Sequence, residues 1–200
     1  VNNPGRLDLN DLAGYRVKER PAVCTDYRDF NVCGMGPPSS GGLTVAQILG
    51  ILESYDLAKM GPNSSDAWRL IGDASRLAFA DRGRYIADSD FVMVPVKGLL
   101  NKKYLENRAT LLNRKKALET VSPGNPPSNT AHSFADDESI ELPSTSHISI
   151  VDQYGNALSM TSTIENAFGS RLMTQGGFLL NNEMTDFSFR DIKDGLPIAN

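Results

Sequence analysis

Hydrophobic positions in the first half of the chain recur every three or four residues, which is the spacing of an amphipathic helix. Two such series are present, and their members are Val45, Ile48, Leu49, Leu52 and Tyr55, followed by Ala67, Leu70, Ile71, Ala74 and Ala78. A third, more charged helix is expected over residues 104–118. An acidic start and a closing glycine predict a short capped helix over 8–14. We therefore expect the first part of the molecule to be mainly helical.

The stretch after these helices breaks all periodicity. Residues 121–130 are rich in proline, asparagine and serine, which predicts a loop that runs to about residue 142. Beyond the loop the hydrophobic period changes to two, the alternation of a half-buried strand. Two strands are expected after residue 144, joined by a turn at 153–156. The last part of the chain is therefore predicted to be strand-rich.

The predicted hairpin has a defined register. Closing it on the turn places Thr145 opposite Thr163. His147 then pairs with Thr161, and Glu165 follows on the same face, because alternate residues of a strand point the same way. The apolar residues take the other face, which we expect to pack on a helix layer. Threonines are also common on plain solvent-exposed strands, and the pattern alone favours that interpretation over a site.

The two cysteines lie in a second predicted hairpin. A turn at Arg28-Asp29 would place Cys24 directly opposite Cys33. Facing cysteines on paired strands can form a disulfide in an oxidising compartment, and two half-buried reduced thiols fit the residue usage equally well. With only His132 and His147 as further ligands, no metal site is expected.

Composition narrows the classes of function. The chain has 200 residues, of which 40% are hydrophobic and 22% charged, and this suffices for one globular domain with a real core. A formal net charge of -4 provides no basic field for nucleic acid or for an anionic membrane. No apolar run is long enough to span a bilayer. The start at Val1 instead of methionine indicates a processed or excised piece, and a small molecule is the expected partner.

Short motifs follow one another in order along nearly the whole chain. Those of the first part are Asp11-Leu12-Ala13, Tyr27-Arg28, Pro37-Pro38-Ser39-Ser40-Gly41-Gly42 and Ala80-Asp81-Arg82. Those of the second part are Thr145-Ser146-His147, Asp152 with Gly155-Asn156, Thr161-Ser162-Thr163, Phe168-Gly169-Ser170 and the run from Leu180 to Ser188. Each motif is weak alone, but the ordered set resembles the γ-glutamyltranspeptidase family. The resemblance implies an α/β (α+β) fold, part of the αββα sandwich of N-terminal nucleophile hydrolases, with an antiparallel sheet and flanking helices.

The same resemblance implies an autoprocessed threonine enzyme without a cofactor. The bond between Ser144 and Thr145 matches the family's processing site. Residues 1–143 would then be the C-terminal part of the large subunit, and residues 144–200 the N-terminal part of the small subunit. Thr145 would become the N-terminal nucleophile, with its freed α-amine as general base, because such an amine has a pKa near 7.7 to 8.0. Thr163 matches the hydroxyl that orients the nucleophile.

Three acidic residues match family positions that hold the substrate. Glu183 and Asp186 would bind the substrate's α-ammonium group through charge-assisted hydrogen bonds. Glu165 lies where well-known members carry asparagine, so it would either strengthen the capture of the ammonium group or mark an altered acyl specificity. The implied substrates are γ-glutamyl amides such as glutathione, with water, an amino acid or a peptide as the acceptor.

Parts of the family's pocket have no counterpart in this sequence. The arginine that binds the substrate carboxylate lies before a segment resembling Val1, and a Ser-Ser pair and a Gly-Gly oxyanion hole lie beyond Asn200. Oxyanion donors contribute about two to three orders of magnitude in rate. The chain alone is therefore expected to be a poor catalyst that needs the remaining parts of its own precursor.

Two alternatives remain beside the γ-glutamyl enzyme. One is a cephalosporin or glutaryl acylase, an amide hydrolase of the same fold, and the other is a non-catalytic scaffold module. The resemblance also implies a periplasmic or secreted location, with which a bridge between Cys24 and Cys33 would agree.

Overall fold

The computed structural model describes residues 7–112, 115–128, 134–137 and 144–199. Its elements in chain order are α1 (Leu9–Gly14), β1 (Val23–Tyr27), β2 (Phe30–Gly34), α2 (Gly41–Leu52), α3 (Leu57–Met60), α4 (Ser65–Tyr85), α5 (Val96–Leu99), α6 (Lys102–Ala109), β3 (Ser146–Val151), β4 (Ala157–Ser162), the 3-10 helix η1 (Glu183–Asp186), β5 (Ile192–Lys193) and β6 (Leu196–Pro197). Within these ranges the strands form three separate antiparallel pairs, β1-β2, β3-β4 and β5-β6. The predicted mixed α/β class is confirmed. No helix of the described ranges is long and apolar enough to cross a membrane.

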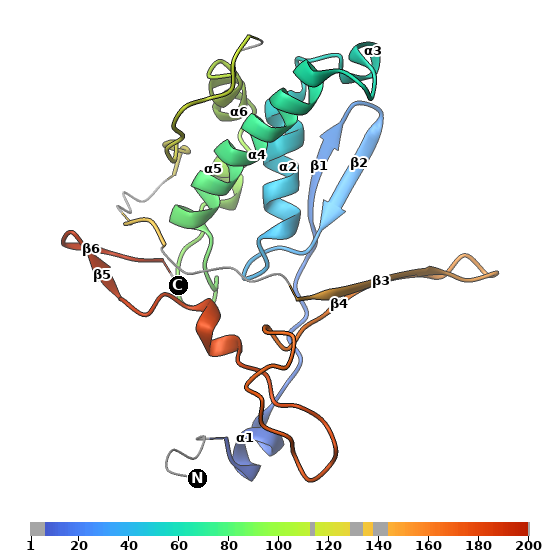
Figure 1. Ribbon diagram of the computed structural model, residues 1–200, viewed down its shortest axis with the longest axis vertical. Helices are drawn as coiled ribbons and strands as arrows, with labels where there is room; N and C mark the ends of the chain where they lie inside the picture. The colour runs from blue at the N-terminus through green and yellow to red at the C-terminus, as the bar shows by residue number, and fades with distance from the viewer. Residues whose placement is uncertain (1–6, 113–114, 129–133, 138–143, 200) are drawn as a thin grey trace.

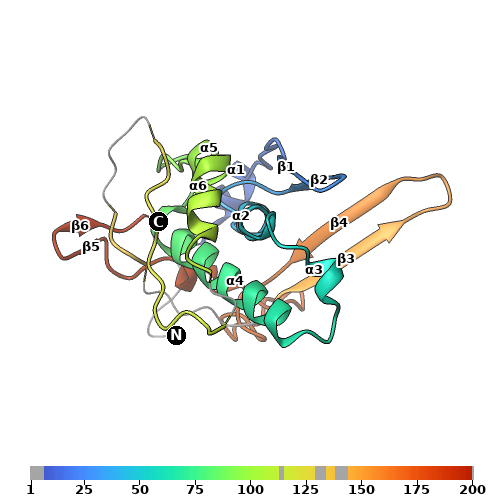
Figure 2. The same ribbon diagram turned by 90° about the horizontal axis from the view of Figure 1, so that it is seen from above.

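The helices form one group, and the β3-β4 and β5-β6 hairpins lie on opposite sides of it (Figure 1). Helices α2, α4, α5 and α6 lie together, and the β1-β2 hairpin runs along α2 (Figure 1). The β3-β4 hairpin extends away on one side and the β5-β6 hairpin lies on the opposite side, and a view from above shows the same separation (Figure 2). The chain that follows β4 loops around the root of that hairpin (Figure 1). The candidate site residues therefore lie outside the helical core.

The core lies between α2 and α4, with α5 and α6 packed against it. Its largest fully buried apolar side chains are Leu43, Ile51, Leu70, Leu77 and Leu99. On α4 the predicted stripe is buried, and Ile71 lies at its edge, packed against the core. Burying each such leucine or isoleucine contributes about 1.5–3 kcal/mol relative to exposure, so this helical group holds the hydrophobic core of the described residues.

The predicted buried face of α2 is partly wrong. Leu52 is buried, but Val45 is 47% exposed, and Ala46 and Gln47 face the core instead. The cause is that α2 is covered from two sides, by α4 and α6 and by the β1-β2 hairpin. The neighbours of a central helix decide which arc is buried, and the apolar stripe alone cannot show this.

Glycines allow the hairpin to approach α2 closely. A Cβ atom added to Gly42 would lie 2.6 Å from the carbonyl oxygen of Met35, and one added to Gly34 would lie 2.6 Å from the Cα atom of Gly42. Both distances are shorter than any ordinary contact. The Pro37–Gly42 motif therefore has a structural role, bringing the end of β2 against the start of α2.

The predicted helix over 104–118 is too long, because α6 ends at Ala109. After α6 the chain turns back onto α4, where the Leu118 N–H donates to both carboxylate oxygens of Asp73, at 3.2 and 3.1 Å. A hydrogen bond to the buried Asp73 carboxylate stabilises this path more than the modest helical propensity of residues 110–118 would stabilise a longer helix. Residues 129–133 and 138–142 of the predicted loop, with His132, lie outside the described residues. Helices α3 and α5 have four residues each, too few to show a hydrophobic period.

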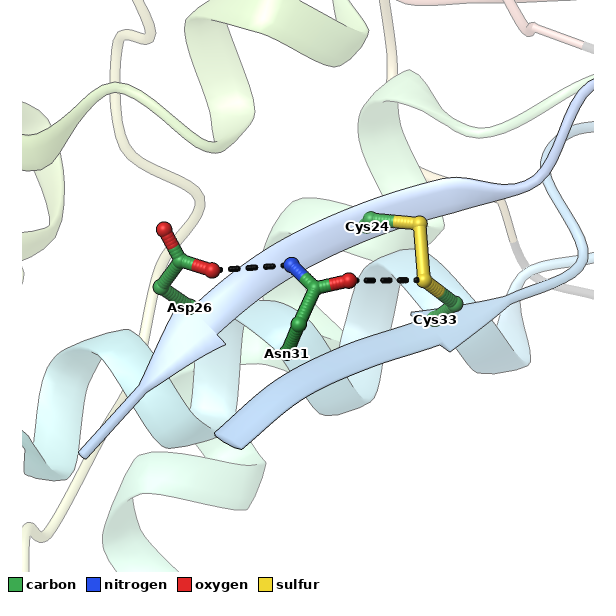
Figure 3. The surroundings of a disulfide bond; sticks show 4 residues. All are labelled: Cys24, Asp26, Asn31 and Cys33. Atoms are coloured by element: carbon green, nitrogen blue, oxygen red, sulfur yellow. Dashed lines mark hydrogen bonds between the residues drawn. A yellow bond between two sulfur atoms is a disulfide. The ribbon is translucent and has the colours of Figure 1, made fainter. Parts of the chain in front are cut away.

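The cysteine hairpin is confirmed, with β1 and β2 joined at the Arg28-Asp29 turn. Cys24 pairs with Cys33 in register, and the two form a disulfide with a Cα–Cα distance of 4.1 Å (Figure 3). Beside the bridge, the side chain of Asn31 donates to Asp26 at 2.8 Å. Of the two interpretations that the sequence leaves open, the structure shows the disulfide.

The register of the β3-β4 hairpin is also confirmed, and a 2.9 Å hydrogen bond joins His147 Nδ1 to Thr161 Oγ1. The expected packing of its apolar face on a helix layer is wrong for the described residues, since both strands contact chiefly each other. The side chains of that face are 44–52% exposed, and they are Ile148, Ile150, Leu158 and Met160. Alternation sets which residues share a face, but it does not determine what covers that face.

Candidate functional site

The root of the β3-β4 hairpin holds the predicted processing bond. The strand pairing ends at Ser146 and Ser162. Continuing it by one residue places Thr145 opposite Thr163, as the sequence predicts. Both threonines are exposed, and among the described residues their hydroxyls form no hydrogen bond with each other. The root of the hairpin thus presents two exposed threonine hydroxyls.

The main chain of Glu165 joins the two sides of this root. Ser144 Oγ donates to the Glu165 carbonyl oxygen. The Glu165 N–H in turn donates to Thr163 Oγ1 at 2.9 Å. The residue before the predicted bond and the predicted orienting hydroxyl are therefore held by the same peptide unit.

Glu165 reaches its position through a turn. Strand β4 ends at Ser162, so the expectation that Glu165 shares the threonine face through strand alternation is wrong. Its φ of +66° is in the left-handed region, which costs a non-glycine residue about 1–2 kcal/mol. Surrounding contacts sustain such conformations. Here the side chain is only 7% exposed, and its carboxylate accepts a hydrogen bond from the Asn182 side chain.

Asn182 organises the acidic end of the site, and the sequence did not single it out. Its N–H donates to the Ile164 carbonyl oxygen at 3.3 Å, and its Oδ1 accepts from the Asn166 N–H at 3.0 Å. Its Nδ2 donates to the Glu165 carboxylate and to Thr185 Oγ1. The residue lies within the Leu180–Ser188 motif, but only the fold shows that it links the turn after β4 to η1.

The two other predicted substrate-binding residues open and close η1. The pKa of Glu183 is raised by partial burial, by a hydrogen bond with Asp186 and by the negative charges of Asp186 and Glu165. One of its carboxylate oxygens, Oε1, is buried without a hydrogen-bond partner. In the described part of the chain, no lysine or arginine pairs with these three carboxylates. Within the described residues, the fold therefore gathers three carboxyl groups without a basic partner.

This arrangement suits a small cation at the carboxylates and a nucleophile nearby. Ionised carboxylates only accept hydrogen bonds, so an ammonium group with three donors complements them. Among the described residues, no group of three or more histidine, cysteine, aspartate or glutamate side chains is arranged to hold a metal ion. The predicted residues thus fall into two sets, joined through Glu165: the hydroxyls of the hairpin root and the carboxylates around η1.

Comparison with known proteins identifies the relatives of this chain. The family model described as gamma-glutamyltranspeptidase matches residues 1–200. The chain is 40% identical over 198 residues to the glutathione hydrolase proenzyme of Escherichia coli (strain K12), covering 98% of this chain and 32% of that protein. It is 38% identical over 186 residues to the acylase ACY 1 proenzyme of Pseudomonas sp. (strain V22), covering 92% and 31%. The chain therefore spans about a third of the length of the curated relatives it matches.

A solved structure shows the same fold. The cephalosporin acylase of Bacillus halodurans superposes with a TM-score of 0.76 over 98% of this chain and 33% of its own, at 24% sequence identity. The likeness extends over the helical group and the strand-rich part together. The family match, which covers the whole chain, agrees with it and carries the assignment. The chain belongs to the gamma-glutamyltranspeptidase family.

Proposed function

We propose that this chain carries the nucleophile and the ammonium-binding part of an enzyme that cleaves γ-glutamyl amides. One observation carries the proposal: Ser144 and Thr163 are both hydrogen-bonded to the main chain of Glu165, whose carboxylate lies with Glu183 and Asp186 in an acidic group that pairs with no lysine or arginine of the described residues. Nucleophile and cation site are thus linked through one residue. The family match supports the same assignment.

Thr145 would first act on its own chain. Its hydroxyl attacks the Ser144 carbonyl carbon, the peptide C–N bond breaks, and the proton passes to the leaving nitrogen, leaving an ester on the threonine oxygen. Water then hydrolyses this ester. The products are a chain that ends at Ser144 and a chain that begins at Thr145 with a free α-amine. The expected division between residues 1–143 in the large subunit and residues 144–200 in the small subunit would accordingly lie within one residue of this cut.

In later turnovers the freed amine takes the proton of the Thr145 hydroxyl. Because an α-amine has a pKa near 7.7 to 8.0, about a tenth of it is already unprotonated at pH 7, and this fraction rises toward pH 8. The hydroxyl attacks the γ-carbonyl of the substrate, the amide bond breaks, and an acyl ester forms on Thr145. Thr163 would orient the nucleophile. Water or an amino acid or peptide then takes the acyl group, which gives hydrolysis or transfer.

The group of three carboxylates, which no lysine or arginine of the described residues pairs with, favours a γ-glutamyl group over a glutaryl group. A γ-glutamyl group carries an α-ammonium that Glu183, Asp186 and Glu165 can hold, whereas a glutaryl group lacks it. The acylase relatives make a glutaryl-type amide hydrolase the second candidate. A periplasmic or secreted location is part of the proposal, and the Cys24–Cys33 disulfide supports it, since such bridges persist in oxidising compartments.

Intact mass under denaturing conditions tests the nucleophile. The protein that carries this chain should yield two pieces divided between Ser144 and Thr145, with a combined mass one water above the uncut chain. Thr145→Ala should stay whole, while Thr145→Ser, which keeps a hydroxyl, should still divide. If the wild-type protein stays as a single uncut species, the proposal of a self-cleaving enzyme is rejected and a non-catalytic scaffold module is favoured.

Substrate preference is tested on the divided protein with γ-glutamyl and glutaryl anilides at equal concentration. We expect faster release from the γ-glutamyl compound, and Glu183→Gln with Asp186→Asn should reduce that preference. A faster reaction with the glutaryl compound would identify an acylase instead.

A further inference from the structure

Residues 134–137 lie between the two parts of the chain that the predicted cut would separate. They end seven positions before Ser144. On one side lies the C-terminal end of α4, and on the other lie residues 188–198. A cavity of about 390 Å³ adjoins the segment, lined among others by Arg84, Phe134 and Lys193.

Two contacts fix the segment to α4. Arg84 Nε donates to Asp136 Oδ1 at 2.6 Å, and the Asp137 N–H donates to the Gly83 carbonyl oxygen at 2.7 Å. The partner carboxylate of Asp136 raises the pKa of the Arg84 guanidinium, chiefly through this hydrogen bond. Since α4 forms the core with α2, residues 134–137 are anchored to a helix of the hydrophobic core.

Two further contacts fix it to the part beyond the bond. Ser188 Oγ donates to Asp137 Oδ1 at 2.6 Å, and the Ala135 N–H donates to the Pro197 carbonyl oxygen at 2.9 Å. Ala135 and Ile198 form a parallel bridge and are each 7% exposed or less. The segment therefore contacts both sides at neighbouring residues.

We propose that residues 134–137, hydrogen-bonded to Arg84 and Ser188, position the Ser144–Thr145 bond for self-cleavage. We call these four residues and their hydrogen bonds the clamp. The inference rests on the proposed function. The chain leading into the bond is held at Asp137, and Ser144 is held on the Glu165 carbonyl oxygen. Attack by a hydroxyl on the adjacent carbonyl requires one specific backbone geometry, and a misplacement of about 1 Å can cost a factor of about a hundred in rate. Releasing the clamp gives the entering chain more conformations and lowers the fraction that can react.

Arg84 and Asp136 touch no reacting atom and act by holding the backbone, so they are positioning residues. Their ion pair is tested by exchanging the two charges. Cleavage of the freshly made full-length protein is followed by intact mass over time. Arg84→Glu and Asp136→Arg should each slow division at least ten-fold, and the double variant should recover most of the rate. Lys116→Glu, which reverses a charge in the exposed Lys116–Glu119 pair, should divide at the wild-type rate.

Melting temperatures of Thr145→Ala forms of the same variants separate positioning from folding. The clamp is supported if the single variants melt within a few degrees of the parent while their cleavage is slow. It is overturned if the single variants divide at the wild-type rate, if slowing only follows loss of melting temperature, or if the double variant recovers nothing. If the wild type divides and the clamp variants divide equally fast, the clamp is rejected but the proposed function is not. Failure of the wild type to divide rejects the proposed function and the clamp with it.

Discussion

Replacing Asp81 by asparagine should destabilise the helical group severely. The Asp81 carboxylate is fully buried and accepts four hydrogen bonds, from Gln47 Nε2 at 2.9 Å, Tyr104 OH at 2.6 Å, Arg108 at 3.1 Å and the Gly124 N–H at 2.8 Å. Burial, and next its hydrogen bond to Asp81, hold the pKa of Tyr104 well above its usual value. Asparagine has one acceptor oxygen, and its NH₂ group would face other donors.

The magnitude follows from the charge left behind. The side chain of Arg108 is 7% exposed, so Asp81→Asn leaves a buried cation without its counterion. Breaking a buried pair in this way costs about 3–5 kcal/mol, a large share of a typical unfolding free energy of about 5–15 kcal/mol.

Urea denaturation followed by circular dichroism, with the disulfide intact, measures these losses in Thr145→Ala protein, which should remain uncut. Asp66→Asn is the matched control, because its pair with Arg69 is on the surface of the same helix and Asp66 is 58% exposed. We expect the control to change the unfolding free energy by less than about 1 kcal/mol. A loss below about 1 kcal/mol for Asp81→Asn would refute the argument that this carboxylate holds the core together.

Three further predictions concern the disulfide, the acidic group and the divided chain. Cys24→Ser with Cys33→Ser should lower the unfolding free energy by about 2–3 kcal/mol, since the bridge closes a short loop in the unfolded chain; an unchanged urea midpoint would contradict this. The pKa of Glu183 is raised in the folded protein, so the charged form is disfavoured there and stability is lost as pH rises above the ordinary value of about 4.3. Glu183→Gln should therefore raise the melting temperature of the uncut protein at pH 7 and have little effect at pH 4, and an equal change at both values would exclude charge repulsion as the cause. After division, the pieces should stay together in native mass spectrometry, because residues 134–137 remain bonded to Ser188 and Pro197; separation at micromolar concentration would disprove this.

Local patterns predicted the elements whose geometry depends on near neighbours in the sequence. The capping box formed by Asp8 and Asp11 starts α1 as expected. Turn position and the period of two gave the pairing of Cys24 with Cys33 and the register that brings Thr145 opposite Thr163. These features need only backbone geometry and side-chain alternation, which act over a few residues.

Contacts between distant segments explain where prediction failed. The chain leaves the helical path after α6, and Asp73, which lies on α4, accepts a hydrogen bond from the Leu118 N–H. The exposure of Val45 depends on what covers α2 from two sides. Neither contact leaves a periodic signal, because the partners are far apart in the sequence. The role of Asn182 was missed for the same reason.

The sequence alone determined the class of the chain, its two hairpins and the register of the β3-β4 hairpin, because these follow from periodicity, turn residues and ordered motifs. Only the tertiary structure decided that Glu165 leaves the strand face through a left-handed turn and lies with Glu183 and Asp186. It also decided that residues 134–137 bridge α4 and residues 188–198. Both results depend on contacts between segments that are far apart in the sequence and meet only in the folded chain. Burial and nearby charges in the folded chain then set the pKa of side chains such as Glu183.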